Sequence, residues 1–326
     1  MKKEDLKIIF MGTPEFAVGS LKALVEGGYR VVAVVTQPDK PVGRHGSVLQ
    51  PSEVKKYALL HQIPVLQPEK MKDPDFLQQL SGFHADLQVV VAFRMLPEVV
   101  WDMPRFGTFN VHAALLPQYR GAAPINWAVI NGEKQTGVTT FFLDHDIDTG
   151  KIIMQRPFAI PDDADVEYVY DGLMRLGADI CIDTVDAILK GDGYVETMPQ
   201  EQMIPVGTTL HVAPKIFKDT CKIDWTQPTK RIYDFIRGLS PYPGAWTLLR
   251  HADDDSVVLK LFCTEKCTAV CTGQPVGTVV CQQGALYVNT ADGAIRVHAL
   301  QMAGKKRMNA TDFLNGFRDD GCWRVE

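Results

Sequence analysis

The stretch Asp86-Leu87-Gln88-Val89-Val90-Val91-Ala92-Phe93 is the strongest strand candidate in this 326-residue sequence. Two further apolar runs precede it, Lys7–Met11 and Arg30–Thr36, with a helical pattern over residues 20–26 between them. The lack of alternation in Arg30–Thr36 predicts burial on both faces, as in a parallel sheet. Strand, helix and strand of these lengths form a βαβ unit. The N-terminal part is therefore predicted to be an α/β domain with a Rossmann-like, mostly parallel sheet.

The carboxyl end of this strand is the expected place for a ligand. In an open α/β sheet, ligands bind outside the carboxyl ends of the strands. The segment Phe109-Asn110-Val111-His112 follows shortly afterwards. The lone Gly12 lacks the G-x-G-x-x-G spacing of a dinucleotide fingerprint, so NAD is disfavoured.

Asn110 and His112 are the first candidates for catalysis. On a strand, a spacing of two places both side chains on one face. A carboxamide can hold a carbonyl oxygen, and an imidazole can move a proton. Asp148, beyond a second strand candidate at residues 137–143, would orient the imidazole, although it could instead simply stabilise a turn. This set suits acyl transfer to an amine, which needs an oxyanion partner and a proton shuttle.

Metal and nucleophile chemistries find less support. Asp144, Asp146 and Asp148 alternate as in an EF-hand, but Thr149 stands where Gly is needed and Gln155 where Glu is needed. Zinc held by His112, His145 and an Asp is possible by residue type, although no spacing demands it. No G-x-S-x-G elbow is present. The seven cysteines contain no Cys-x2-Cys pair, and reduced thiols are the favoured interpretation.

Composition indicates a globular protein of two domains. No apolar run approaches the ~20 residues that span a bilayer, and Met1–Leu6 is too short and acidic for a signal peptide, so the cytoplasm is expected. The net charge of −5 argues against general nucleic-acid coating. Residues 215–326, however, hold 15 Lys and Arg against 12 Asp and Glu. That excess is compatible with a phosphate-bearing partner, or with an ordinary solvated face.

The C-terminal part changes character. A long amphipathic helix over residues 165–191 ends the α/β portion, and residues 200–218 are typical of a linker. One helix, Thr229–Gly238, then precedes several short, regularly spaced strands, which predict a small β-barrel.

Taken together, these motifs resemble the methionyl-tRNA formyltransferase family through nearly the whole chain. The N-terminal matches are Gly12–Ala17, Thr36–Arg44, Asn110–His112 with Leu115–Pro117, Arg120–Ile125, and Asp148–Gly150. The C-terminal matches are Ala213–Ile216, Ile223–Trp225, Pro243–Trp246 and Gly304–Met308. The Asn, His and Asp set alone would indicate only the wider folate-dependent formyltransferases.

The resemblance implies a formyltransferase-type catalytic domain over residues 1–205, a linker over 206–218, and an OB-like β-barrel that binds tRNA over 219–326. It implies transfer of a formyl group from 10-formyltetrahydrofolate to the α-amino group of methionine on initiator tRNA, with no metal. Asn110 would hold the formyl oxygen, His112 would stabilise charge or relay a proton, and Asp148 would organise His112 and a water.

The same resemblance assigns the binding residues. The folate pocket would be lined by Ala114, Leu115, Leu116 and Pro117. The tRNA would be contacted by Lys40, Arg44, Arg120, Lys305, Lys306 and Arg307, and a monomer without membrane attachment is expected.

Two departures and two rival functions accompany this prediction. Phe93-Arg94 stands where the family pattern resembles Tyr-Gly, which affects how the pterin is gripped. His45-Gly46-Ser47 stands where lysines are frequent. One rival uses the same folate donor with another acceptor or with water, as a sugar-amine formyltransferase or a formylfolate hydrolase. The other is an RNA-binding protein with an inactive α/β domain.

Overall fold

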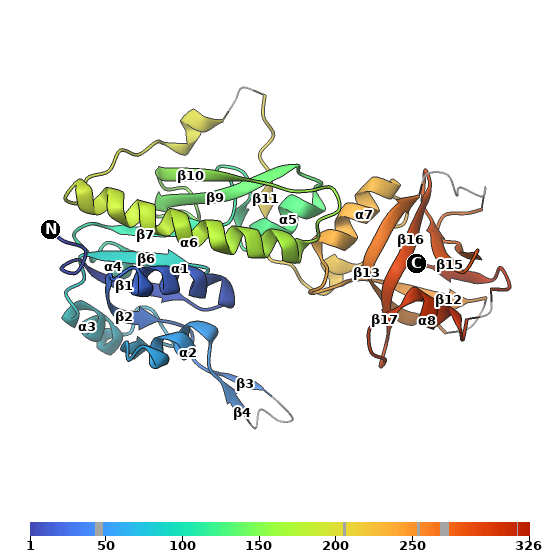
Figure 1. The fold of residues 1–326 in the computed structure, drawn as a ribbon, viewed down its shortest axis with the longest axis horizontal. Coiled ribbons are helices and arrows are strands. Elements are labelled where there is room, and N and C mark those ends of the chain that lie inside the picture. Colours follow the sequence, from blue (N-terminus) through green and yellow to red (C-terminus); the bar gives the residue numbers. More distant parts are fainter. Residues whose placement is uncertain (43–47, 205–206, 253–254, 268–273, 318) are drawn as a thin grey trace. The chain divides into compact units, whose positions relative to one another are not determined.

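The computed structural model describes residues 1–42, 48–204, 207–252, 255–267, 274–317 and 319–326 (Figure 1). By its internal contacts the chain divides into two compact units. Unit 1 consists of Met1–Gly121, Thr136–Ala159 and Tyr170–Val212, and unit 2 of Ala122–Gln135, Ile160–Val169 and Ala213–Glu326. Each unit therefore combines three separate stretches of sequence. The domain limits at 205 and 218 stay a prediction.

Unit 1 is built on a seven-stranded sheet of order β10-β9-β7-β6-β1-β2-β5. Strands β5, β2, β1, β6 and β7 are parallel, and β9 runs antiparallel to β7. The mostly parallel, Rossmann-like sheet predicted from the sequence is confirmed. The strands are β1 Lys7–Gly12, β2 Arg30–Val35, β5 Val65–Leu66, β6 Leu87–Val91, β7 Thr108–His112, β9 Gln135–Phe142 and β10 Ile152–Ala159.

Helices cover both faces of this sheet. One face packs against α3 and α4 through a buried cluster that includes Ile9, Met11 and Val90. On the other face, a Cβ at Gly177 of α6 would lie 3.5 Å from Val111, and Gly19 of α1 lies against Met174 of α6. The helices are α1 Glu15–Glu26, α2 Glu53–Leu60, α3 Pro74–Gly82, α4 Glu98–Trp101 and α6 Val166–Lys190.

The order of the strands creates the site. From β1 the chain proceeds to β2 and β5 on one side, and then returns to β6 and β7 on the other side. Such a reversal leaves a crevice at the carboxyl ends of the central strands. At Gly12, the last residue of β1, a Cβ would lie 2.7 Å from Ala17 and 3.0 Å from the carbonyl oxygen of Val91. Glycine is thus needed where β1 and β6 end together.

Unit 2 contains an antiparallel sheet of order β14-β15-β16-β13-β12-β18. A bridge between Thr278 and Arg324 joins its two ends, so the sheet nearly closes into a barrel. The predicted C-terminal β-barrel is confirmed. The strands of unit 2 are β12 Ala245–His251, β13 Val257–Cys267, β14 Val279–Gln282, β15 Ala285–Asn289, β16 Ala294–Met302, β17 Met308–Asn309 and β18 Trp323–Val325. Its helices are α5 Pro124–Ile130, α7 Thr229–Gly238 and α8 Ala310–Leu314.

Several short elements complete the chain. β3 (Lys40–Val42) pairs antiparallel with β4 (Val48–Gln50). β8 (Arg120–Gly121) pairs with β11 (Val212–Ala213). The 3-10 turns are η2 (Gln200–Met203) and η3 (Asp219–Cys221). Within the described ranges, no helix has the length and apolar character required to cross a membrane.

Candidate active site

β7 brings Asn110 and His112 to the carboxyl edge of the sheet. Asn110 pairs in register with Val90 of β6 and with Phe141 of β9, and His112 pairs with Thr139. Because side chains alternate along a strand, both residues point to the face that carries Val90. The predicted strand and the shared face are confirmed.

The contacts of His112 select one tautomer of its neutral ring. Its side chain is 6% exposed, and Nε2 lies 3.0 Å from the carbonyl oxygen of Tyr119. A carbonyl only accepts hydrogen bonds, so Nε2 carries the proton in the neutral ring. Nδ1 then keeps its lone pair and faces Asp148 Oδ2 at 3.8 Å. His112 can therefore accept a proton at Nδ1 beside a carboxylate that stabilises the resulting cation.

Asp148 sits on a tight turn. Its φ is +56°, and its carboxylate Oδ2 accepts a hydrogen bond of 2.9 Å from the backbone N–H of Gly121. Two residues later, a Cβ at Gly150 would lie 1.7 Å from the carbonyl oxygen of Phe142. The turn thus places the carboxylate between His112 and Gly121, as the predicted grouping of Asp148 with His112 requires.

Asn110 offers an unused polar atom. Its side-chain oxygen is buried and has no hydrogen-bond partner among the described residues. A buried amide without a partner is unfavourable by about 1–3 kcal/mol unless a ligand satisfies it. This oxygen can accept a hydrogen bond from an N–H group of a substrate.

The loop after β7 is fixed by two side chains on neighbouring strands. Thr139 Oγ1 donates to the carbonyl of Ala114 at 2.6 Å and accepts from the N–H of Leu116 at 3.1 Å. Gln155 Nε2 donates to the carbonyl of Leu116 at 2.7 Å. Of the residues predicted to bind folate, Ala114, Leu116 and Pro117 are buried, while Leu115 is half-buried. The loop thus forms a rigid wall beside His112.

The residues predicted to contact tRNA lie in different places. In unit 1, Lys40 is exposed on β3, while the guanidinium of Arg120 binds the side-chain oxygen of Gln200. In unit 2, Lys305, Lys306 and Arg307 are exposed between β16 and β17, with Arg307 stacked over Phe262 at 4.3 Å. Arg44 lies outside the described residues.

Arg94, at the first departure from the family pattern, lies three residues after the end of β6. Its guanidinium donates to the carbonyl oxygens of Pro68 and Glu69, the latter at 2.9 Å. Burial lowers the pKa of this guanidinium. Arg94 thereby ties the end of β6 to the segment before α3.

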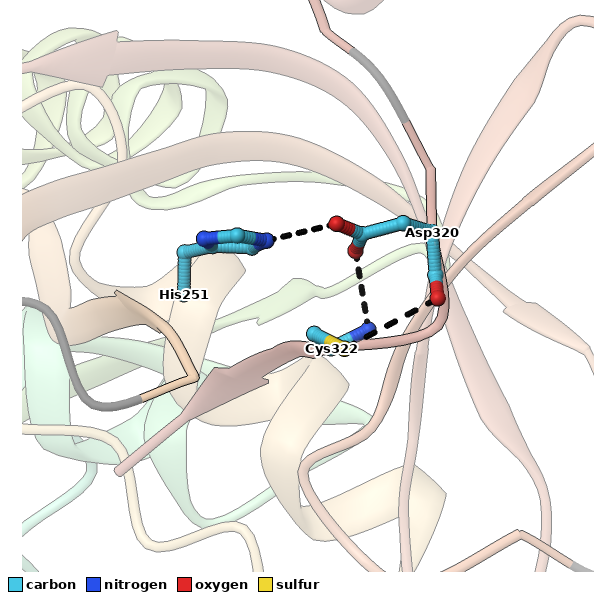
Figure 2. A group of neighbouring side chains, drawn as sticks. All are labelled: His251, Asp320 and Cys322. Atoms are coloured by element: carbon cyan, nitrogen blue, oxygen red, sulfur yellow. Dashed lines mark hydrogen bonds and ion pairs between the residues drawn. The ribbon is translucent and has the colours of Figure 1, made fainter.

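One group of possible metal ligands lies far from this site in the sequence. Among the described residues, only His251, Asp320 and Cys322 bring three such atoms within 4.8 Å of one another (Figure 2). His251 Nε2 lies 2.7 Å from Asp320 Oδ2, and the N–H of Cys322 donates to Asp320 Oδ1 at 3.0 Å. The hydrogen bond from His251 lowers the pKa of Asp320. Both carboxylate oxygens are thus already used in a hydrogen-bonded turn before β18.

Several contributors to the site were not predicted. Thr139 lies on the strand expected at residues 137–143, so pairing that strand with β7 would have found it. Gln155 lies one strand further along the sheet, on β10. The Tyr119 carbonyl and the Gly121 N–H are backbone groups, which carry no side-chain signature. Gln200 lies 52 residues from Asp148 in a stretch predicted as linker, and the sequence offers no signal for it.

The comparisons with known proteins agree with this geometry. Residues 6–185 match the family "Formyl transferase", and residues 215–318 match "Formyl transferase, C-terminal domain". A crystal structure of WlaRD, a sugar 3N-formyl transferase, has a TM-score of 0.62 at 18% identity, covering 92% of this chain and 99% of that one. HypX from Aquifex aeolicus, in complex with tetrahydrofolic acid, has a TM-score of 0.61 at 18% identity, covering 96% of this chain but only 47% of its own. Fold, site and family matches together define a formyl transferase.

Relatives of higher sequence identity show which family of formyl transferases the chain resembles. The methionyl-tRNA formyltransferase of Parabacteroides distasonis is 62% identical over 98% of both chains, and that of Bacteroides thetaiotaomicron is 58% identical over 98% of both. The enzyme of the same name from Porphyromonas gingivalis is 48% identical over 97% of both. The chain belongs to the methionyl-tRNA formyltransferase family.

Proposed function

We propose that the protein transfers a formyl group from 10-formyltetrahydrofolate to the α-amino group of methionine on initiator methionyl-tRNA. The product, N-formylmethionyl-tRNA, serves translation initiation. The observation that carries this proposal is identity of up to 62%, over nearly the whole chain, to relatives named for this reaction. The Asn110, His112 and Asp148 arrangement supplies the chemistry it needs.

Each of the three residues has one role. The side-chain N–H of Asn110 donates a hydrogen bond to the formyl oxygen, where negative charge develops as the amine attacks. His112 Nδ1 accepts the proton that the amine loses when the new C–N bond forms. Asp148 then faces the imidazolium and stabilises its charge. The reaction ends when the bond between the formyl carbon and N10 of the folate breaks and N10 gains a proton.

The donor folate supplies an activated formyl group, and the residues beside His112 fit such a ligand. The buried oxygen of Asn110 lacks a partner among the described residues, and the wall at Ala114–Pro117 is immobilised by Thr139 and Gln155. We infer that this wall binds the folate next to Asn110. No step of the proposed chemistry involves a metal.

The proposed tRNA contacts are Lys40, Arg44, Lys305, Lys306 and Arg307. Lys40, Lys305, Lys306 and Arg307 are exposed, and exposed cations attract the phosphate backbone; Arg44 is proposed from the sequence alone. Arg120 was predicted with them, but its guanidinium lies on Gln200 within unit 1. We expect the enzyme to act as a monomer in the cytoplasm, where aminoacylated initiator tRNA is used.

The test is a formyl-transfer assay with radiolabelled methionyl-tRNA and 10-formyltetrahydrofolate. We expect turnover in the wild type, a fall in kcat of about 10²–10³ in Asn110→Ala, and a fall of about 10²–10⁴ in His112→Ala. Binding of tRNA should persist in both variants.

Other outcomes would reject the proposal. Bound tRNA without any turnover would leave an RNA-binding protein. Consumption of the folate without formylated tRNA would indicate a formylfolate hydrolase or another amine acceptor, such as an amino sugar.

A further inference from the structure

Gln200 is a fully buried amide whose hydrogen-bonding capacity is completely used. Its Nε2 donates to the carbonyl of Asp148 at 2.9 Å and to the carbonyl of Gly150 at 2.8 Å. Its Oε1 accepts from Arg120 Nε at 3.0 Å and from Arg120 Nη2 at 2.6 Å. An amide has two N–H donors and two acceptor lone pairs. All four are satisfied, and the side chain is 0% exposed.

The two donors of Gln200 grip the turn that carries Asp148. They bind the carbonyls on either side of Thr149, and Asp148 itself has a φ of +56°, which is uncommon for a residue other than glycine. A conformation of this kind persists only when surrounding contacts enforce it. Gln200 thus helps determine where the Asp148 carboxylate points.

The two acceptor sites of Gln200 close a ring of contacts. Arg120 binds Gln200, and its neighbour Gly121 donates its N–H to Asp148 Oδ2 at 2.9 Å. The ring therefore runs from Gln200 through Arg120 and Gly121 to Asp148, and back through the carbonyl of Asp148. Its members come from β8, from the turn after β9 and from η2, all within unit 1. Such a ring fixes the carboxylate by its side chain and by its backbone at once.

We infer that Gln200 is a positioning residue for formyl transfer, which holds the Asp148 carboxylate facing His112 and uses Arg120 as its brace. The inference rests on the proposed function for its kinetic consequence. In this arrangement Arg120 supports the active site by holding Gln200 in place. A displacement of about 1 Å in a catalytic group can lower the rate about 100-fold.

Two variants test the hydrogen bonds of Gln200. Gln200→Met keeps the approximate length of the side chain but removes all four hydrogen bonds. Gln200→Glu keeps acceptors for Arg120 but places a carboxylate against two carbonyls. We expect kcat to fall about 10- to 100-fold in both variants, while the KM values for folate and tRNA change little. In ¹³C-histidine-labelled protein, the ring signal of His112, assigned with His112→Gln, should shift in both.

Thr184→Val is the matched control. Thr184 is also fully buried in unit 1 and hydrogen-bonds Thr140 at 2.9 Å, so its loss lowers stability without touching Asp148. Gln200 variants that lose no more kcat than Thr184→Val and leave the His112 signal in place would overturn the inference. If the wild type transfers no formyl group, the proposed function fails, while the His112 signal still decides the role of Gln200.

Discussion

His112 shows which part of a site a sequence can reveal at the scale of single residues. The residue types and spacing of Asn110, His112 and Asp148 were sufficient to predict that His112 and Asp148 lie close together, and their side chains are 3.8 Å apart. The catalytic roles of the three residues stay a prediction. The atoms that orient them were not predictable, because the Tyr119 carbonyl and the Gly121 N–H belong to the backbone. Gln200 was not predicted because only the folded chain brings it next to Asp148.

Gly150 gives a sharp prediction at this scale. In Gly150→Ala, the new Cβ would lie 1.7 Å from the carbonyl oxygen of Phe142, so the backbone must move. We expect a loss of about 3 kcal/mol in the free energy of unfolding, as in severe overpacking. We also expect kcat to fall, since the same turn carries Asp148. Urea denaturation and the formyl-transfer assay measure the two effects.

Gly82→Ala is the control for this substitution. A Cβ at Gly82, the last residue of α3, meets nothing within 4 Å. Its stability should match or slightly exceed that of the wild type. Equal stability of Gly150→Ala and the wild type would contradict the steric argument.

At the scale of elements, strongly patterned segments were predictable and short ones were not. The helix predicted at Thr229–Gly238 is α7 with the same bounds, and the helix predicted at 165–191 is α6 at Val166–Lys190. β3 and β4 were not predicted because strands of three exposed residues give no periodicity. Short strands of this kind depend on pairing partners that local patterns do not specify.

Helix α6 carries a prediction about alkaline stability. Burial raises the pKa of the Cys181 thiol to about 12, against an ordinary value of 9.0. Above pH 9 the unfolded chain releases this proton while the native state retains it, so stability falls as pH rises. Between pH 7.5 and 10 this thiol should account for about 1.4 kcal/mol of the loss.

The measurement compares urea unfolding of wild type and Cys181→Ala at the two pH values. The loss between them should be smaller in the variant by that amount. Cys263→Ala removes an exposed cysteine and should leave the loss unchanged. An equal loss in wild type and Cys181→Ala would show that the buried thiol does not contribute.

At the scale of the whole molecule, charge is distributed unevenly along the chain. The net charge is −5, yet residues 215–326 carry an excess of cations, among them the exposed Lys305, Lys306 and Arg307. Each cation that neutralises a tRNA phosphate releases counterions, and so steepens the salt dependence of binding.

We therefore expect Lys306→Ala to reduce the slope of log K against log salt concentration by about 0.7–0.9. Filter binding of methionyl-tRNA over a range of salt concentrations measures this slope. Lys22→Ala, which removes an exposed lysine of α1 paired with Glu26, should leave the slope unaltered. The same slope in both variants would exclude Lys306 from the tRNA interface.

The division of the chain also bears on how the protein is made. Unit 2 needs residues 122–135 and 160–169 as well as the stretch from 213 onward, and Ile130 of α5 lies in its core. On the ribosome, α5 is therefore synthesised well before α7, against which it packs, and its apolar face stays uncovered until α7 emerges. A truncated chain that stops before α7 would leave α5 exposed to proteases and chaperones.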